Sequence, residues 1–491
     1  MKNKVIIYLL TLAFVFTSAA NIFALANDVY DVNINELDDS NPIIDEEPDT
    51  PDPEPLEDRR LEIEEYDSTE AHENSVDNEE LEISEEDVLD GVQGNGEKTF
   101  TVTKKPISGG EEKLVGDYDT FHKAIEACKQ EDLTNEYIVT MNSDYDIPET
   151  EGMWGKLKVN MILKSKEGNH FTLKRSNKNL MSLYNDTNLK IENVILDGAG
   201  GAQAFGVTGG TLTLASGAIV QNFTEYPGFD GPAIIVSSNG ILNIEDGAII
   251  QSNHSNRQGG AIQAYNGTTV NISGGTFKNN KSNKSDGGAI AAYGTLNITG
   301  GTFEDNEAKK TGGAIIIGQN STASISNATF KNNKASTGGA IYSLQEINAS
   351  NLTFEGNEAN FGGAVFASKG VELNNATFNE NTAKKRGGAI YASQGVELNN
   401  VTFTENTAEN QGGGIYISKG DSKLEYCKFI KNGSQAIFIN HDNGGTTTIS
   451  NTSFTENYSN NFGGGIYLGK NSKLIVNEST FTKNEAAFGA A

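Results

Sequence analysis

Residues 370–393 read GVELNNATFNENTAKKRGGAIYAS, and residues 395–418 read GVELNNVTFTENTAENQGGGIYIS. Aligned without gaps, the two stretches are identical at 17 of 24 positions, and their starts lie 25 residues apart. A fixed period of this length is typical of chains built from stacked supersecondary units. The repeated residues serve either a shape or a chemistry, and their types distinguish the two.

The same pattern continues on both sides of this stretch. A phenylalanine recurs every 24–27 residues, and an asparagine follows each one three positions later. A pair of glycines precedes an apolar step in most units, as at Gly387-Gly388. The repeated residues are Phe277, Phe303, Phe330, Phe354, Phe378, Phe403, Phe429, Phe454 and Phe481, and Asn280, Asn306, Asn333, Asn357, Asn381, Asn406, Asn432, Asn457 and Asn484.

Within each unit the apolar residues alternate with polar ones. Val371 and Leu373 show this period of two, as do Ile390 and Ala392. Such runs of three to six residues between Asn, Gly and Lys predict short strands, and the glycine and asparagine density excludes helix. Three strands per 25 residues predict one coil of a parallel β-helix, with coils about 4.8 Å apart. We expect an all-β fold of about a dozen coils (10–12).

This geometry explains the repeated residues. Stacked phenylalanines would form an interior ladder, in which each ring is buried against the copies above and below. Each asparagine falls at a turn, where its amide can hydrogen-bond the same amide of neighbouring coils. The paired glycines would allow corner dihedrals that other residues rarely adopt.

The chain divides into four parts. Residues 1–26 combine two early lysines, an apolar run and the ending Ala24-Leu25-Ala26, which indicates a signal peptide; an uncleaved membrane anchor is the alternative. Residues 27–97 carry 28 acidic side chains against two arginines, which predicts a disordered linker. Residues 98–178 are expected to form a cap and residues 179–491 the coils, most regular over 250–491. No segment after residue 26 is apolar enough to span a bilayer.

The two ends of the stack differ. Residues 119–130, DTFHKAIEACKQ, place Phe121, Ala124, Ile125 and Cys128 on one helical face, so we expect this helix and nearby strands to cover the first coil. The last residues, AAFGAA, resemble the start of another coil. We therefore expect either a missing carboxy-terminal region or end-to-end association there.

The two cysteines are too few and too distant to form a disulfide framework. Cys128 and Cys427 lie about 300 residues apart, and Cys427 takes a place that holds Ala, Leu or Val in other repeats. It is predicted to be a small buried apolar side chain.

The combination of GGAIY with Phe-x-x-Asn resembles the repeat of the chlamydial polymorphic outer-membrane proteins. It is also similar to bacterial and archaeal adhesin-like proteins with pectin-lyase-like β-helices. The resemblance covers residues 250–491 closely and 179–250 more weakly. It implies a right-handed, single-stranded β-helix and a surface role in adhesion. The sequence shows no cell-wall sorting motif or terminal apolar anchor, so export is implied more strongly than attachment to an outer membrane.

Related β-helices include polysaccharide lyases and hydrolases, which need convergent carboxylates or a calcium cluster. Such a site should interrupt the repeat. Two interruptions contain candidates, His441 with Asp442 and Asp230 with His254 and Arg257, but looped-out turns are the favoured interpretation of both. The turn LDGAGG at 196–201 resembles a polygalacturonase turn only faintly. No spacing matches a known metal site, so we expect no cofactor, no metal and no catalysis.

The alternation also predicts an aromatic stripe. If Ile341, Ile390 and Ile415 point inward, the residues that follow them point outward. These are Tyr342, Phe366, Tyr391, Tyr416 and Tyr467. Mutual stacking that stabilises neighbouring coils is the favoured interpretation. The alternative is an exposed platform for a glycan or a protein.

Together these observations favour a secreted or cell-surface, non-enzymatic protein that binds host, cell-surface or polysaccharide ligands. A polysaccharide-active enzyme or a plain carbohydrate-binding rod is the alternative. Ice binding through Thr302, Thr353 and Thr402 would need a double array, and only one row is visible. No basic stripe is evident in the sequence, so no nucleic-acid partner is expected.

Overall fold

The computed structural model describes residues 98–128, 132–151, 154–176, 179–201, 203–224, 231–441 and 444–489. The expected signal peptide (residues 1–26) and acidic linker (residues 27–97) lie outside the described residues, which begin at Lys98. Asp230 and Asp442 lie outside them as well.

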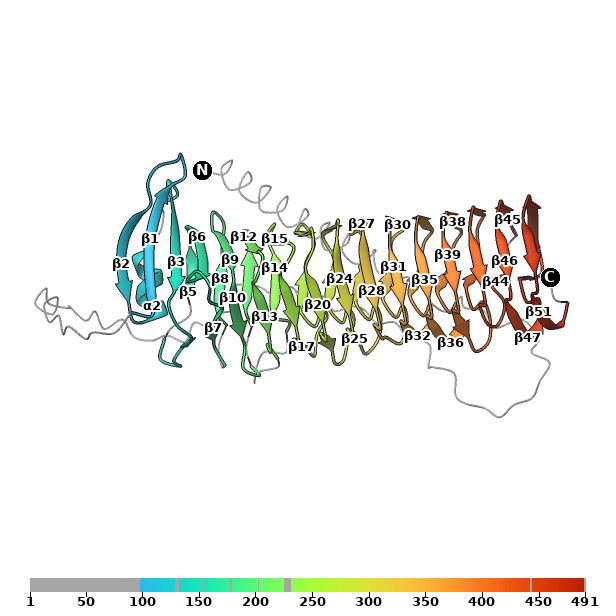
Figure 1. Ribbon diagram of the computed structural model, residues 1–491, viewed down its shortest axis with the longest axis horizontal. Helices are drawn as coiled ribbons and strands as arrows, with labels where there is room; N and C mark the ends of the chain where they lie inside the picture. The colour runs from blue at the N-terminus through green and yellow to red at the C-terminus, as the bar shows by residue number, and fades with distance from the viewer. Residues whose placement is uncertain are drawn as a thin grey trace, which may run out of the picture. The chain divides into compact units, whose positions relative to one another are not determined.

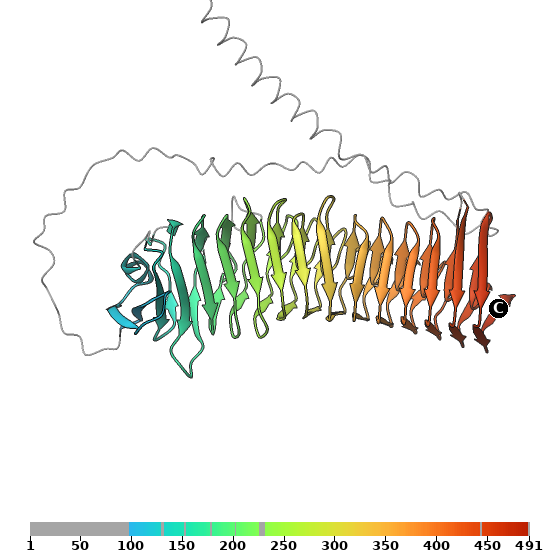
Figure 2. The ribbon, with the colours of Figure 1, turned by 90° about the horizontal axis from the view of Figure 1, so that it is seen from above.

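From β3 (Asn135–Met141) onward the chain winds into stacked coils with three long sheets along its length (Figures 1 and 2). The first sheet has 16 strands and ends at β49 (Ser472–Asn477). The second has 14, from β4 (Tyr145–Asp146) to β50 (Thr480–Thr482), and the third has 13. The predicted all-β parallel β-helix is confirmed. The third sheet gives it about 13 coils, slightly more than the 10–12 expected.

The third sheet positions the residues discussed below. Its strands are short, and most are buried on both faces. In chain order they are β5 (Trp154–Leu157), β8 (Met181–Leu183), β11 (Phe205–Thr208), β14 (Ile234–Ser237), β18 (Ile262–Ala264), β22 (Ile290–Ala292), β26 (Ile315–Ile317), β29 (Ile341–Ser343), β33 (Val365–Ala367), β37 (Ile390–Ala392), β41 (Ile415–Ile417), β44 (Ile437–Ile439) and β48 (Ile466–Leu468).

The two stretches that resemble each other most form consecutive coils. The first contains β34 (Val371–Asn374), β35 (Thr377–Asn379) and β36 (Thr382–Arg386) before β37. The second contains β38 (Val396–Asn399), β39 (Thr402–Thr404) and β40 (Thr407–Ala408) before β41. Each residue pairs with its equivalent, as Leu373 does with Leu398 and Phe378 with Phe403. A slip by one residue would turn the apolar side chains outward, and this fixes the register.

The two glycines of the pair are required for different structural reasons. Gly387 has φ +67°, a conformation that side chains disfavour. Gly388 is needed for space, because a Cβ there would lie 2.1 Å from the Gly413 carbonyl oxygen of the next coil. The expectation that both glycines supply corner dihedrals is therefore corrected: only the first does so. The corner after β35 has positive φ at Glu380 without any glycine.

A small α/β unit precedes the coils. The strand β1 (Phe100–Pro106) pairs antiparallel with β2 (Lys113–Tyr118) and with β3. The helix α2 (Phe121–Ala127) is capped by Thr120, whose hydroxyl accepts a hydrogen bond from the Lys123 amide at 3.3 Å. Parallel pairing begins between β3 and β6 (Asn160–Ser165), so the first coils lie within the range expected to form the cap.

The last described coil is more exposed than those before it. Phe481 is 37% exposed, and Phe488 in β51 (Glu485–Phe488) is 63% exposed. The strand β51 pairs with β47 (Tyr458–Phe462) of the preceding coil. In the part of the chain that the structure describes, no helix has the length and apolar character to span a membrane.

Candidate functional site

The repeated phenylalanines form one continuous stack inside the helix. Neighbouring ring centroids lie 4.6–5.0 Å apart, and neighbouring planes differ by at most 11°. All are fully buried except Phe481 at the last coil. These rings contribute to the core, and those from Phe277 to Phe454 are closed to a ligand.

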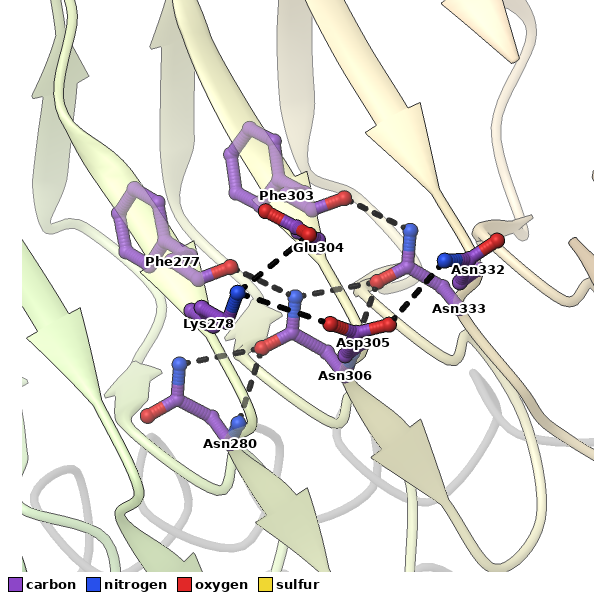
Figure 3. Close-up of polar contacts among 9 residues, drawn as sticks. All are labelled: Phe277, Lys278, Asn280, Phe303, Glu304, Asp305, Asn306, Asn332 and Asn333. Atoms are coloured by element: carbon purple, nitrogen blue, oxygen red, sulfur yellow. Dashed lines mark hydrogen bonds and ion pairs between the residues drawn. The ribbon is translucent and has the colours of Figure 1, made fainter. Parts of the chain in front are cut away.

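The repeated asparagines form a second internal ladder (Figure 3). Asn306 shows the pattern: its side-chain Nδ2 donates to the Phe277 carbonyl at 2.9 Å and to Asn333 Oδ1 at 3.0 Å. Its Oδ1 accepts from the backbone amide of Asn280 at 3.0 Å and from Asn280 Nδ2 at 3.1 Å. The amide thus makes four hydrogen bonds, all within the protein, while being fully buried. The ladder serves the fold itself.

The predicted aromatic stripe lies on the outer face of the third sheet but is not exposed. Tyr342 and Phe366 are 9% and 7% exposed, and Tyr391 and Tyr416 are 0% and 3% exposed. Only Tyr467 is partly exposed. Neighbouring rings stack with centroids 4.5–5.3 Å apart. The prediction of an exposed platform is therefore wrong for these four residues, and the geometry agrees with mutual stacking. We call this column the outer aromatic stack.

Side chains just before the glycine pairs cover the outer aromatic stack. Phe361 contacts Tyr391 edge-on, with ring centroids 5.9 Å apart. The Arg386 guanidinium lies over the Tyr416 ring at 5.4 Å. Burial is the main reason that the pKa of Tyr391 is raised above its ordinary value. At these coils the third sheet is thus packed on both faces.

The stack also contains members that the repeat pattern did not reveal. Phe438 lies between Tyr416 and Tyr467, in a coil that lacks the glycine pair. Ile316 and Ala291 continue the column toward the amino terminus. Each of these three residues directly follows the inward-facing isoleucine of its strand. The sequence could therefore have predicted their places in the column from that position alone.

Each candidate catalytic group is described only in part, because Asp230 and Asp442 lie outside the described residues. His441 is fully buried, and its Nε2 lies 3.0 Å from the Thr447 hydroxyl. His254 lies in β17 (His254–Ser255), on a different coil from His441. In the LDGAGG turn, Asp197 accepts hydrogen bonds from Gln221 and Asn222 at 2.8 and 3.0 Å, which is a structural role.

A shallow depression on the outer face of the first sheet contains two carboxylates. It encloses about 250 Å³ and is lined by Glu397, Asp421, Ser422, Lys423, Thr446 and Thr448. Asp421 accepts a hydrogen bond from the Thr446 amide at 2.7 Å, and Lys423 pairs with Glu425 at 2.8 Å. Asp421 and Lys423 are thus engaged in local contacts. Among the described residues, no group of three or more His, Cys, Asp or Glu side chains is placed to hold a metal ion.

The outward threonines form a single row on the second sheet. Thr302, Thr353 and Thr402 are aligned through Thr329 and Thr377 in the intervening coils. The next outward row alternates in charge, with Lys278, Glu304, Lys331 and Glu355 in consecutive coils. Beside Thr302 and Thr353 the structure therefore places charged side chains where a second threonine row would be needed, whereas the same row holds Asn379 and Thr404 in the next two coils.

Both cysteines are buried thiols. Burial raises the pKa of Cys128 to about 12 and that of Cys427 to about 11. The folded state keeps these protons longer than the unfolded state, so their contribution to stability is complete below about pH 8.5 and is lost as pH rises toward 11–12. We expect the Cys128 and Cys427 thiols to react slowly with a chromogenic thiol reagent at pH 8 while the protein is folded, and rapidly once it unfolds. The rate of dye release, measured at increasing guanidinium concentrations, tests this. Rapid labelling of the native protein would contradict this burial.

The comparisons with known proteins agree with this architecture. Residues 372–490 match the family model described as a right-handed beta helix region. Residues 327–344 and 351–368 match the Chlamydia polymorphic membrane protein repeat. No curated protein matches the chain. Among solved structures, the crystal structure of a mutant of the periplasmic alginate epimerase AlgG is similar, with a TM-score of 0.34 and 11% identity over 78% of this chain and 94% of that one. That likeness is too distant to bear on function. The chain carries repeats of the Chlamydia polymorphic membrane protein type within a right-handed β-helix.

Proposed function

We propose that this protein is a secreted or cell-surface adhesin-like rod that binds a ligand on another surface without chemical turnover. The observation that supports this most directly is the use of the repeated side chains. The phenylalanines, asparagines and glycines contact copies of themselves, and the outer aromatic stack is buried too. What differs from coil to coil is the solvent-facing surface, which suits recognition more than catalysis.

The outer face of the first sheet shows this variation. Successive coils present Asn243, Asn271, Asn297, Ser324, Asn348, Glu372, Glu397 and Lys423 at one outward position. A rigid sheet that carries a changing row of polar side chains can recognise an extended ligand at little cost in ordering. The matched repeats support a place at the cell surface.

The proposal predicts adhesion by the full chain. Beads coated with it should bind cells or immobilised polysaccharides at least several-fold more than beads coated with the heat-unfolded chain, because the surface exists only when the coils are stacked. Bead retention under flow measures this. Equal retention by folded and unfolded chains, or none by either, would remove the adhesin proposal.

The enzyme alternative predicts a different outcome. From pectin-like polymers or alginate, a lyase would release unsaturated uronates, which absorb ultraviolet light, and a hydrolase would release new reducing ends. We expect the protein to release neither. Release that Asp230→Asn or Asp442→Asn abolished would support a polysaccharide-active enzyme instead. Both residues lie outside the described part of the chain.

A further inference from the structure

One corner of the helix repeats an asparagine in successive coils and replaces it once by a tyrosine. At this corner each coil passes from the first sheet to the second, and the residue directly after the first-sheet strand has positive φ. Tyr426, for example, follows β42 (Ser422–Glu425). We call this column the asparagine corner. Its residues are Asn327, Asn351, Asn375, Asn400, Tyr426 and Asn451, with φ between +51° and +56°.

Backbone hydrogen bonds align the asparagine corner from coil to coil. The Asn400 amide donates to the Glu425 carbonyl at 3.0 Å, and the Tyr426 amide donates to the Ser450 carbonyl at 3.2 Å. Each acceptor directly precedes the equivalent corner residue of the next coil. Tyr426 therefore lies between Asn400 and Asn451, one coil from each.

The Tyr426 ring is exposed where packing does not require it. Its side chain is 56% exposed, and among the described side chains before β47 no other phenylalanine or tyrosine is as exposed. It is also the sole aromatic residue with positive φ in the part of the chain that the structure describes. Asparagine tolerates this conformation, whereas a bulky side chain is strained in it. Strain of this kind, held on an exposed ring, indicates a functional position.

The amides on both sides of the ring are exposed and partly ordered. Asn400 and Asn451 both face solvent. The Asn400 Nδ2 donates to Asn375 Oδ1 at 2.8 Å, which orients its amide. This bond uses one of the two N–H groups, so the second N–H and the Oδ1 of Asn400 can bond a ligand. The corner thus offers an apolar ring with hydrogen-bonding groups above and below it.

The charges beside Tyr426 nearly cancel. Glu425 pairs with Lys423 at 2.8 Å. Lys428, in β43 (Lys428–Ile430), adds one exposed cation two residues after the ring. One cation is too few for a polymer that carries a charge on each sugar. The surroundings of the ring therefore suit an uncharged ligand better than a polyanion.

We infer that Tyr426, Asn400 and Asn451 form a subsite for an uncharged, β-linked hexopyranose chain. This inference rests on the proposed adhesin function and names its ligand class. One face of such a sugar presents C–H groups that pack against an aromatic ring, and its hydroxyls exchange hydrogen bonds with amides. The three side chains form a row about 10 Å long, at about 4.8 Å per coil, along which an extended chain can lie.

The polar setting favours a glycan over a protein partner. Specific protein interfaces cover about 800 Å² on each side and surround their aromatic anchors with packed neighbours. Tyr426 instead has asparagines on both sides along its corner. A single ring between amides matches one sugar face and the hydroxyls around it.

The test measures binding of cellohexaose and chitohexaose to the full-length protein by titration calorimetry. Tyr426→Asn inserts the residue that the corner uses in other coils, so the fold should tolerate it. We expect this variant to raise Kd about tenfold and to melt no lower than wild type, because the positive φ suits asparagine. Tyr426→Phe retains the ring and should leave Kd within about twofold of wild type.

A second pair of variants tests the amide. Asn400→Ala and Asn351→Ala each remove an exposed corner asparagine that donates one hydrogen bond to the preceding coil, at 2.8 and 3.0 Å. Their effects on stability should be similar. Only Asn400 lies beside Tyr426, so Asn400→Ala should raise Kd several-fold and Asn351→Ala should not change it.

Unchanged affinity of Tyr426→Asn, or melting of this variant well below wild type, would overturn the assignment of a binding role to the ring. Tighter binding of hexagalacturonate than of both uncharged hexasaccharides would overturn the ligand class. Adhesion of wild-type beads without binding of either uncharged hexasaccharide would remove this inference and leave the adhesin proposal standing. Failure of folded beads to adhere to any surface would remove the adhesin proposal itself.

Discussion

Replacing Asn381 by alanine should destabilise the coils more than any exposed substitution. Its side chain donates to the Phe354 carbonyl at 3.0 Å and to Asn406 Oδ1 at 2.9 Å. Its Oδ1 accepts from the backbone amide and side chain of Asn357 at 3.0 and 2.9 Å. The substitution leaves several buried polar groups without partners, each at a cost of about 1–3 kcal/mol. We expect the free energy of unfolding to fall by about 3–5 kcal/mol in total.

Guanidinium unfolding followed by circular dichroism measures this loss. Because each coil contacts only its neighbours, a weakened interface can also split the transition in two. Asn379→Ala is the matched control: its side chain is partly exposed and donates to Glu380 at 3.3 Å. The free energy of unfolding of this variant should lie within about 0.5 kcal/mol of that of the wild type. Identical midpoints for the two variants would show that the ladder contributes nothing beyond ordinary surface contacts.

Replacing Tyr391 and Tyr416 together by serine should damage the fold. Both rings are buried in the outer aromatic stack, with centroids 4.8 Å apart. Removing a large buried ring costs about 3–5 kcal/mol, although two neighbouring losses need not add. A fall in adhesion by this variant would therefore report on folding, not on a lost binding platform.

Tyr391→Phe with Tyr416→Phe is the informative control. Phe366 and Phe438 occupy equivalent places in the column, so the rings fit without the hydroxyl groups. We expect this variant to melt within a few degrees of wild type and the serine variant to melt far lower, as scanning calorimetry measures. Equal melting of the serine variant and wild type would mean that the outer aromatic stack is not part of the core.

The two aromatic columns show how much of the side-chain arrangement the sequence periodicity predicts. The alternation of Val371, Leu373 and Phe378 indicated which residues face the interior, and the coil spacing followed from strand geometry. The same alternation placed Tyr391 on the outer face correctly. It could not show that Phe361 and Arg386 cover that face, because the residue type at this covering position varies along the stack, from Thr337 to Phe361 to Arg386.

The sequence by itself determined the strands, the coil period and the interior. Interior side chains must repeat because each stacks on its own copy, and repetition can be read directly. The tertiary structure alone decided which outward residues are covered and that Gly388 is required for space. These properties depend on contacts between residues that lie about 25 positions apart in the sequence. Because the residue types at these positions vary from coil to coil, no local sequence pattern predicts the contacts.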